Sequence, residues 1–171
     1  MSSDMLWGAM QRRSILLLPL LLSTAVLALA ADKEILLIAG PPSHGPWEHE
    51  QNADALLLAS ILNRQRGIHA TVSRSGWPKD ESLLRKADAI FVFCDGSARH
   101  LAFQEDRPAA VRAAMKRGAG LMFYHYAVEP PDTEVRSQML DWLGGYFELR
   151  YSVNPIWEAD FTAIPKHPVT N

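Results

Sequence analysis

Short apolar segments alternate with segments of helical periodicity along most of this chain, and this alternation constrains its fold more than any other feature. The predicted strands cover residues 34–40, 68–73, 89–94, 120–125 and 157–163. The first, third and fourth of them are apolar runs typical of buried strands. The predicted helices between the strands cover residues 51–65, 81–86, 105–117 and 133–143. Because strands joined by helices run parallel in one sheet, the sequence predicts a doubly wound parallel α/β fold with helices on both faces.

The first 31 residues are predicted to be a signal peptide rather than part of this fold. Arg12 and Arg13 precede a mostly apolar run at residues 15–30, and Ala28-Leu29-Ala30 offers a small-x-small cleavage site. The run is shorter than the ~20 residues that a membrane-spanning helix needs. We therefore expect an exported, periplasmic or extracellular protein that has no membrane contact after cleavage, with a domain at residues 32–171. A retained N-terminal anchor is the alternative.

The net charge limits which partners the chain can bind, and the cysteine content limits how its fold can be stabilised. The formal net charge is -2 and the sequence pI is about 6.3, so the chain has no basic footprint for nucleic acid. Cys94 is the single cysteine, which leaves the hydrophobic core to stabilise the domain without an intramolecular disulfide. The last residues, 164–171, resemble an ordered connection, so we expect a domain that is incomplete at its C-terminus.

Four of the six histidines fall just after a predicted strand. His44 and His49 follow the first strand, His100 follows the third, and His125 stands at the tip of the fourth. In an open parallel sheet the ligand crevice lies outside the carboxyl ends of the strands, so residues far apart in sequence converge there. Histidine binds metals and moves protons near neutral pH. His69 begins a strand away from this edge and is predicted to be structural.

Six segments resemble the ThuA-like, or trehalose-utilisation, family, and more narrowly its exported bacterial branch. They are SHGPWEHE from Ser43, GWP from Gly76, CDG from Cys94, HYAVE from His125, LDWLGGYFE from Leu140, and NPIW…HPVT from Asn154. Each motif is weak alone, but their order and spacing together are specific and span nearly all of the mature chain. The resemblance implies a flavodoxin-like sheet related to class I glutamine amidotransferases and an association with sugar catabolism. Members of this family usually continue past the His-Pro motif.

The chain departs from the amidotransferases at the position of their nucleophile. Those enzymes place a cysteine in a glycine-rich turn after a central strand, where this chain has His125. Cys94 lies after another strand and has no Gly-x-Cys-x-Gly setting. The sequence therefore predicts that the chain is not a glutaminase.

His125 and Glu129 are the predicted catalytic residues. His125 would act as a general acid or base, or as a metal ligand, although a core histidine bonded to a backbone carbonyl is the alternative. Glu129 would orient His125 or accept a substrate hydroxyl, although a carboxylate at a helix start is equally compatible with its position.

His44, His49 and His125 are predicted to bind a divalent metal such as zinc, because histidines with a nearby carboxylate suit such ions. Convergence alone supports this prediction, since the spacing matches no His-Glu-x-x-His or Cys₂His₂ pattern. Gly45 and Pro46 shape a tight loop that lets both loop histidines face the crevice.

Trp47, Asp95 and His100 are predicted to contact substrate. Trp47 would stack on a sugar ring, and Asp95 would be a ligand unless it only binds N–H groups of its loop. His100 would join the site unless it is a solvated loop residue. Together these residues predict an enzyme that hydrolyses or isomerises a carbohydrate or related small polar metabolite. A non-catalytic sugar-binding or scaffolding module is the alternative.

Overall fold

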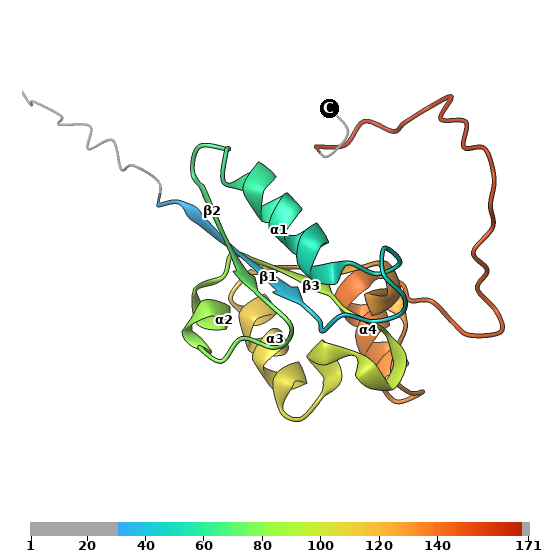
Figure 1. Cartoon of the computed structure of the whole chain (residues 1–171), viewed down its shortest axis with the longest axis horizontal. Helices are drawn as coiled ribbons and strands as arrows, with labels where there is room; N and C mark the ends of the chain where they lie inside the picture. Colours follow the sequence, from blue (N-terminus) through green and yellow to red (C-terminus); the bar gives the residue numbers. More distant parts are fainter. Residues whose placement is uncertain (1–30, 169–171) are drawn as a thin grey trace, which may run out of the picture.

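Four parallel strands form the central sheet of the computed structural model, which describes residues 31–168 (Figure 1). They are β1 (Lys33–Ala39), β2 (Ile68–Ser73), β3 (Ala89–Phe93) and β4 (Gly120–Tyr124). The strand order β2-β1-β3-β4 is that of a flavodoxin-like sheet, which confirms the predicted fold class. The predicted signal peptide falls almost wholly outside the described residues.

Helices cover both faces of this sheet. They are α1 (Gln51–Leu62), α2 (Ser82–Lys86), α3 (Arg107–Lys116) and α4 (Val135–Leu143). α1 packs on one face and the other three helices pack on the opposite face, so the sheet is doubly wound as predicted (Figure 1). Three of the helices are a few residues shorter than the sequence predicted. None of the helices within residues 31–168 is both long and apolar enough to cross a membrane.

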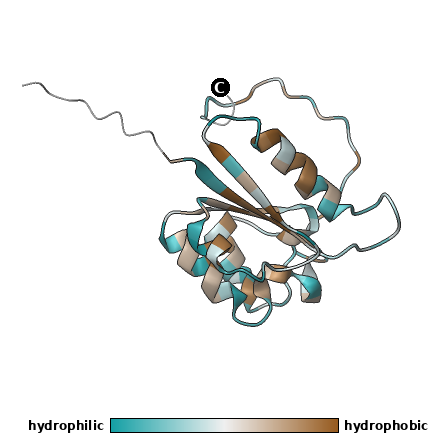
Figure 2. Cartoon of the chain, turned by 60° about the vertical axis from the view of Figure 1, so that its left-hand side comes forward, coloured by the Kyte–Doolittle hydropathy of each residue, from teal (hydrophilic) through white to brown (hydrophobic). Residues whose placement is uncertain are grey.

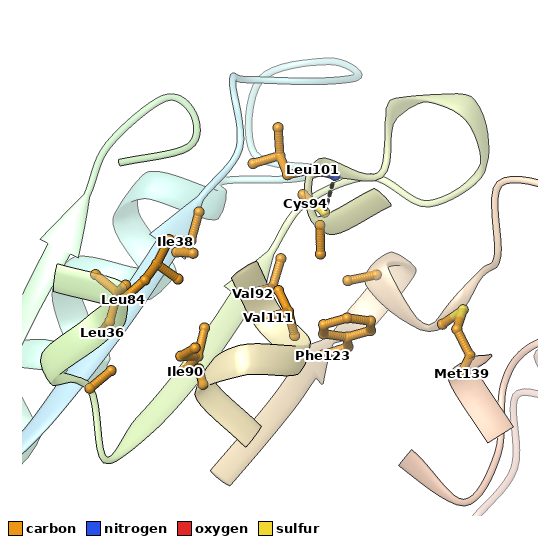
Figure 3. Close-up of a cluster of buried hydrophobic side chains, with 14 residues drawn as sticks. Leu36, Ile38, Leu84, Ile90, Val92, Cys94, Leu101, Val111, Phe123 and Met139 are labelled. Carbon is orange, nitrogen blue, oxygen red and sulfur yellow. Dashed lines mark hydrogen bonds between the residues drawn. The ribbon is translucent and has the colours of Figure 1, made fainter. Parts of the chain in front are cut away.

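Alternating side chains of the strands build a core on each side of the sheet. In β1, Leu36 and Ile38 point toward α2 and α3, whereas Leu37 and Ala39 point toward α1. All four are buried, as expected for a strand covered on both faces. The larger core lies on the side of α2, α3 and α4, where Val111 of α3 and Met139 of α4 are fully buried (Figure 3).

The face covered by α1 is only partly closed. α1 buries Ala55 and Ala59 against the sheet and leaves Leu56, Leu57 and Ile61 exposed. Figure 2 shows hydrophobic residues along this helix. In β4, Met122 pairs with Phe91 and Tyr124 with Phe93, so both point to the α1 side. Both are exposed, because α1 packs over β1 and β2 and does not extend over β4. β4 is therefore an edge strand with one open face.

The predicted fifth strand at residues 157–163 is wrong. This segment has no regular secondary structure and pairs with no strand, and Trp157 and Phe161 are exposed. Figure 1 shows the chain after α4 running away from the sheet as a long loop. The apolar residues of the segment suggested a strand, but a strand also requires a neighbour to accept its backbone hydrogen bonds.

Candidate functional site

The candidate site lies at the carboxyl edge of the sheet, where the loops after β1, β3 and β4 meet. These three strands are adjacent in the order β1-β3-β4, so their C-terminal loops are neighbours. The chain leaves β1 toward β2 on one side and returns to β3 on the other, which makes the gap between β1 and β3 the topological switch point. Open α/β sheets bind ligands at such points.

A tight loop after β1 brings His44 and His49 together. Ser43 and His49 form an isolated antiparallel bridge that closes the loop. His44 and Trp47 adopt positive φ angles of 63° and 72°, and the Glu48 carboxylate accepts a hydrogen bond from Gly45 N at 2.9 Å. As a result the two imidazole rings lie 4.0 Å apart between centroids. The two loop histidines therefore lie side by side.

Asp95, from the loop after β3, completes a group that could hold a metal ion. The ligating atoms of His44, His49 and Asp95 all lie within 4.8 Å of one another. Two of these residues follow β1 and the third follows β3, so the group straddles the switch point. His125, which we predicted as the third metal ligand, is outside this group. Asp95, predicted to contact substrate, takes that place.

Neighbouring side chains hold Asp95 in position. Ser43 Oγ donates to Asp95 Oδ1 at 2.7 Å, and Gln51 Nε2 donates to the same oxygen at 3.2 Å. Arg99 pairs with Asp95 Oδ2 at 2.7 Å from the 3₁₀ turn η1 (Ser97–Arg99). A carboxylate accepts about four hydrogen bonds. Beyond Ser43, Gln51 and Arg99, this largely buried group therefore retains acceptor capacity toward His49, whose Nδ1 lies 3.9 Å from Asp95 Oδ1.

The surroundings of His49 favour its neutral form. Burial lowers its pKa, and the neighbouring imidazoles of His44 and His125 lower it further. Asp95 and Glu48 oppose this shift without reversing it. Because a metal ion binds the neutral imidazole, a lowered pKa leaves His49 competent as a ligand at neutral pH.

His125 begins the 3₁₀ turn η3 (His125–Val128) directly after β4, with a φ of 57°. Positive φ is unfavourable for a residue with a Cβ, and such residues concentrate at functional sites. The turn places the His125 ring 5.1 Å from His49 and 4.6 Å from Tyr126. The predicted convergence of His125 with His44 and His49 is therefore found, with His49 in the middle.

Two hollows flank His125 and Tyr126. One hollow, of about 210 Å³, is lined by His125 and Tyr126 together with Glu48, His49, Asp54 and Tyr124. The other, of about 330 Å³, lies between these two residues and Glu129, Phe147 and Asn154. Glu129 thus lies in the second hollow and not with the metal-ligating group. A ligand of the size of a sugar ring could contact His125 from either side.

His100 does not line either hollow. Its side chain is 1% exposed, its Nε2 donates to Ala127 O at 2.7 Å, and its Nδ1 accepts from Ala102 N at 3.2 Å. These bonds fix the neutral tautomer, and burial lowers the pKa of His100 to about 4. His100 therefore supports the turn that carries His125, a role that we did not predict.

Trp47, which we predicted to contact substrate, and Cys94, the single cysteine, lie in opposite environments. Trp47 is 91% exposed at the tip of the loop after β1, so it packs on no wall of the site. Cys94 is buried, and this burial raises the pKa of its thiol to about 12. A protonated, buried thiol is a poor nucleophile.

Four functional candidates were missed by sequence reasoning: Ser43, Gln51, Arg99 and Tyr126. Ser43 and Gln51 orient Asp95, Arg99 pairs with it, and the Tyr126 ring lies 4.8 Å from that of His49. Ser43 and Tyr126 each adjoin a predicted histidine, which was the one signal available. Gln51 and Arg99 carry no such signal, because their roles depend on Asp95.

Comparison of the chain with protein-family models, with curated proteins and with solved structures gave no match. The strand order and the geometry of the site therefore carry the functional argument.

Proposed function

We propose that this chain is an exported, ThuA-like protein that hydrolyses or isomerises a carbohydrate or a related small polar metabolite, with a divalent metal ion such as zinc. The observation that carries the proposal is the convergence of His44, His49 and Asp95 at the switch point. The motifs described above support the family, and the pattern of residues 1–31 supports export.

The donor set fits a catalytic metal centre. Catalytic zinc sites commonly use three protein ligands drawn from histidines and a carboxylate and leave one position open. Ser43 and Gln51 would orient the Asp95 carboxylate, as hydrogen-bonding partners of metal ligands usually do. When bound, the metal would polarise a substrate carbonyl or activate a water molecule.

The residues around this centre supply proton transfer and substrate contacts. His125 lines the same hollow as His49 and would exchange a proton with a substrate hydroxyl through a ring nitrogen. The rings of Tyr124 and Tyr126 line the hollow and would pack on the C–H face of a sugar. Glu129, in the adjoining hollow, would accept a hydrogen bond from a second hydroxyl.

Turnover of a panel of aldoses, ketoses and small glycosides by the zinc-loaded protein tests the proposal. We expect His125→Ala to reduce kcat by about 10²–10⁴-fold, the usual contribution of a general acid or base. The variant should keep its metal and its affinity for substrate. His69→Ala is the matched control, because His69 is exposed and pairs with Glu34 outside the site. If nothing is turned over and His125→Ala weakens only sugar binding, the chain is a sugar-binding module.

A further inference from the structure

The side of the sheet that α1 covers only in part carries a set of exposed apolar side chains. Met122 and Tyr124 of β4 point to this side and are exposed. Asp54 of α1 lines the smaller hollow of the candidate site together with Tyr124, so this flank of α1 faces β4. Leu57 and Ile61 follow Asp54 at helical spacing on the same flank, and both are exposed. We call Leu57, Ile61, Met122 and Tyr124 the open face.

The chain also has an exposed apolar segment, residues 153–168, which we call the arm. Every residue of the arm is exposed, and its large apolar side chains are those of Val153, Ile156, Trp157, Phe161 and Ile164. Figure 1 shows the arm leaving the sheet of its own copy. Large apolar side chains gathered in one exposed segment indicate contact with another surface.

The turn before the arm fixes where the arm leaves the domain. The N–H groups of Tyr151 and Ser152 donate to Glu148 O at 3.1 Å and 2.8 Å, and Ser152 Oγ accepts from Glu148 N at 3.0 Å. The Glu148 carboxylate pairs with Arg136 of α4 at 2.8 Å. These contacts tie the start of the arm to the domain in a direction that leads away from the sheet (Figure 1).

The arm and the open face are large enough for a stable contact between two copies. A buried Trp or Phe side chain removes about 150–250 Å² from water, so Trp157 and Phe161 of two copies would contribute about 600–1,000 Å². The side chains that they cover add to this area. Specific interfaces bury about 1,200–2,000 Å² in total, which two such contacts can reach.

We infer that two copies of this chain form a dimer by exchanging arms, so that Trp157 and Phe161 of each copy pack on the open face of the other. Each copy supplies one arm and one open face, so a single twofold axis satisfies both copies at once. The inference does not rest on the proposed function. It adds a partner to the site, because Tyr124 belongs both to the open face and to the smaller hollow.

Sedimentation over a dilution series of the protein tests the inference, and we expect a dimer. An arm variant, Trp157→Ser with Phe161→Ser, should raise the dissociation constant of the dimer at least about 100-fold, because buried aromatic anchors carry most of the energy of an interface. A face variant, Leu57→Gln with Met122→Gln, should weaken the dimer in the same way.

A matched control removes two exposed aromatic side chains outside both surfaces. Trp47 and Tyr151 are 91% and 86% exposed, and neither belongs to the arm or the open face. Trp47→Ser with Tyr151→Ser should therefore leave the dimer intact. Circular dichroism and thermal melting check that every variant keeps its fold.

Mixing the arm variant with the face variant distinguishes exchange from other arrangements. The arm variant keeps an intact open face, and the face variant keeps an intact arm. One of the two contacts can therefore form between them, and a mixed dimer should appear although each variant alone is monomeric. An arm that folds back on its own copy would give no such dimer.

Each other outcome overturns the exchange. A monomeric unmodified protein shows that the arm does not bind a second copy. A dimer that survives in the arm variant places the contact elsewhere on the surface. A mixture of the two variants that stays monomeric excludes a contact between the arm of one copy and the face of another. None of these results bears on the turnover of sugars, so the proposed function stands or falls separately.

Discussion

His100 Nε2 donates a 2.7 Å hydrogen bond to the carbonyl oxygen of Ala127, inside the turn that begins at His125. The two residues belong to loops after different strands, β3 and β4. Because both are fully or almost fully buried, no water replaces this bond. The candidate catalytic histidine is thus supported by a second histidine that has no access to substrate.

Replacing His100 should show how strongly this bond supports the fold. We expect His100→Leu to lower the free energy of unfolding by about 2 kcal/mol, because it leaves the Ala127 carbonyl buried without a donor. His100→Gln keeps an N–H donor near the position of Nε2 and should lose less. Urea unfolding of both variants measures the difference. Equal losses would show that ring packing, and not the hydrogen bond, dominates.

Acid should destabilise the protein through His100, because its pKa is lowered in the folded state. Burial lowers the pKa of His100 from 6.5 to about 4 in the folded state. Between these values the unfolded chain binds more protons, so the contribution to stability is complete above about pH 6.5 and is lost as pH falls toward 4. The full loss is about 3 kcal/mol.

Urea unfolding at several pH values from about 7 to 4.5 measures this effect. His100→Gln has no titrating group at this position and should lose the part of the pH dependence that His100 contributes. The lowered pKa of His49 adds a loss of the same sign in this window, and the raised pKa of His69 acts in the opposite direction. The carboxyl groups of Asp80 and Asp88 have lowered pKa values, so their contributions are lost only at more acidic pH. An unchanged pH dependence in the variant would assign the effect to another group.

Metal binding should depend on Asp95 as much as on the histidines. We expect one zinc ion per chain by elemental analysis, and His44→Ala, His49→Ala or Asp95→Asn should each weaken binding by more than about 100-fold. This is more than the 10–100-fold expected for Ser43→Ala, which removes only an orienting bond. His125→Ala should retain the ion. Loss of zinc in His125→Ala with retention in Asp95→Asn would reverse the assignment.

Close packing between the loops after β3 and β4 should make Gly96→Ala harmful. A Cβ at Gly96 would overlap with the carbonyl oxygen of Tyr126 and with Glu129 Cβ. We expect a loss of about 1–3 kcal/mol in the free energy of unfolding, together with displacement of the turn that carries His125. Gly145→Ala is the control, because a Cβ there meets nothing within 4 Å. Similar melting of the two variants would contradict this packing.

Cys94 should be unreactive in the native protein. Its thiol is buried with a pKa raised to about 12, so very little thiolate exists at pH 8. Iodoacetamide should label the chain only slowly under native conditions and fully in concentrated urea, as mass spectrometry would show. Because Cys94 is the single cysteine, each label reports on this position. Rapid native labelling would indicate a reactive nucleophile.

The sequence predicted the sheet well because short apolar runs between helical segments leave a strong local signal. The apolar runs of β1, β3 and β4 needed no knowledge of their partners. The segment at residues 157–163 failed because pairing is not a local property. Its apolar residues are present, but no strand accepts its hydrogen bonds.

The sequence predicted the location of the candidate site but not the roles of all its residues. Positions after parallel strands located His44, His49 and His125, since topology alone brings those loops together. Asp95 rather than His125 joined the ligating group because the order of strands puts β3 next to β1. The burial of His100 depends on packing against Phe103 and Phe123, which no spacing rule reveals.

The open side of β4 links the candidate site to whatever lies beside the sheet. His125 follows the last residue of this edge strand, and Tyr124 of the same strand lines the hollow. The outer backbone N–H and C=O groups of an edge strand can pair with another chain. A strand that docked there would lie beside the hollow that Tyr124 and His125 line, so assembly would alter the candidate site directly.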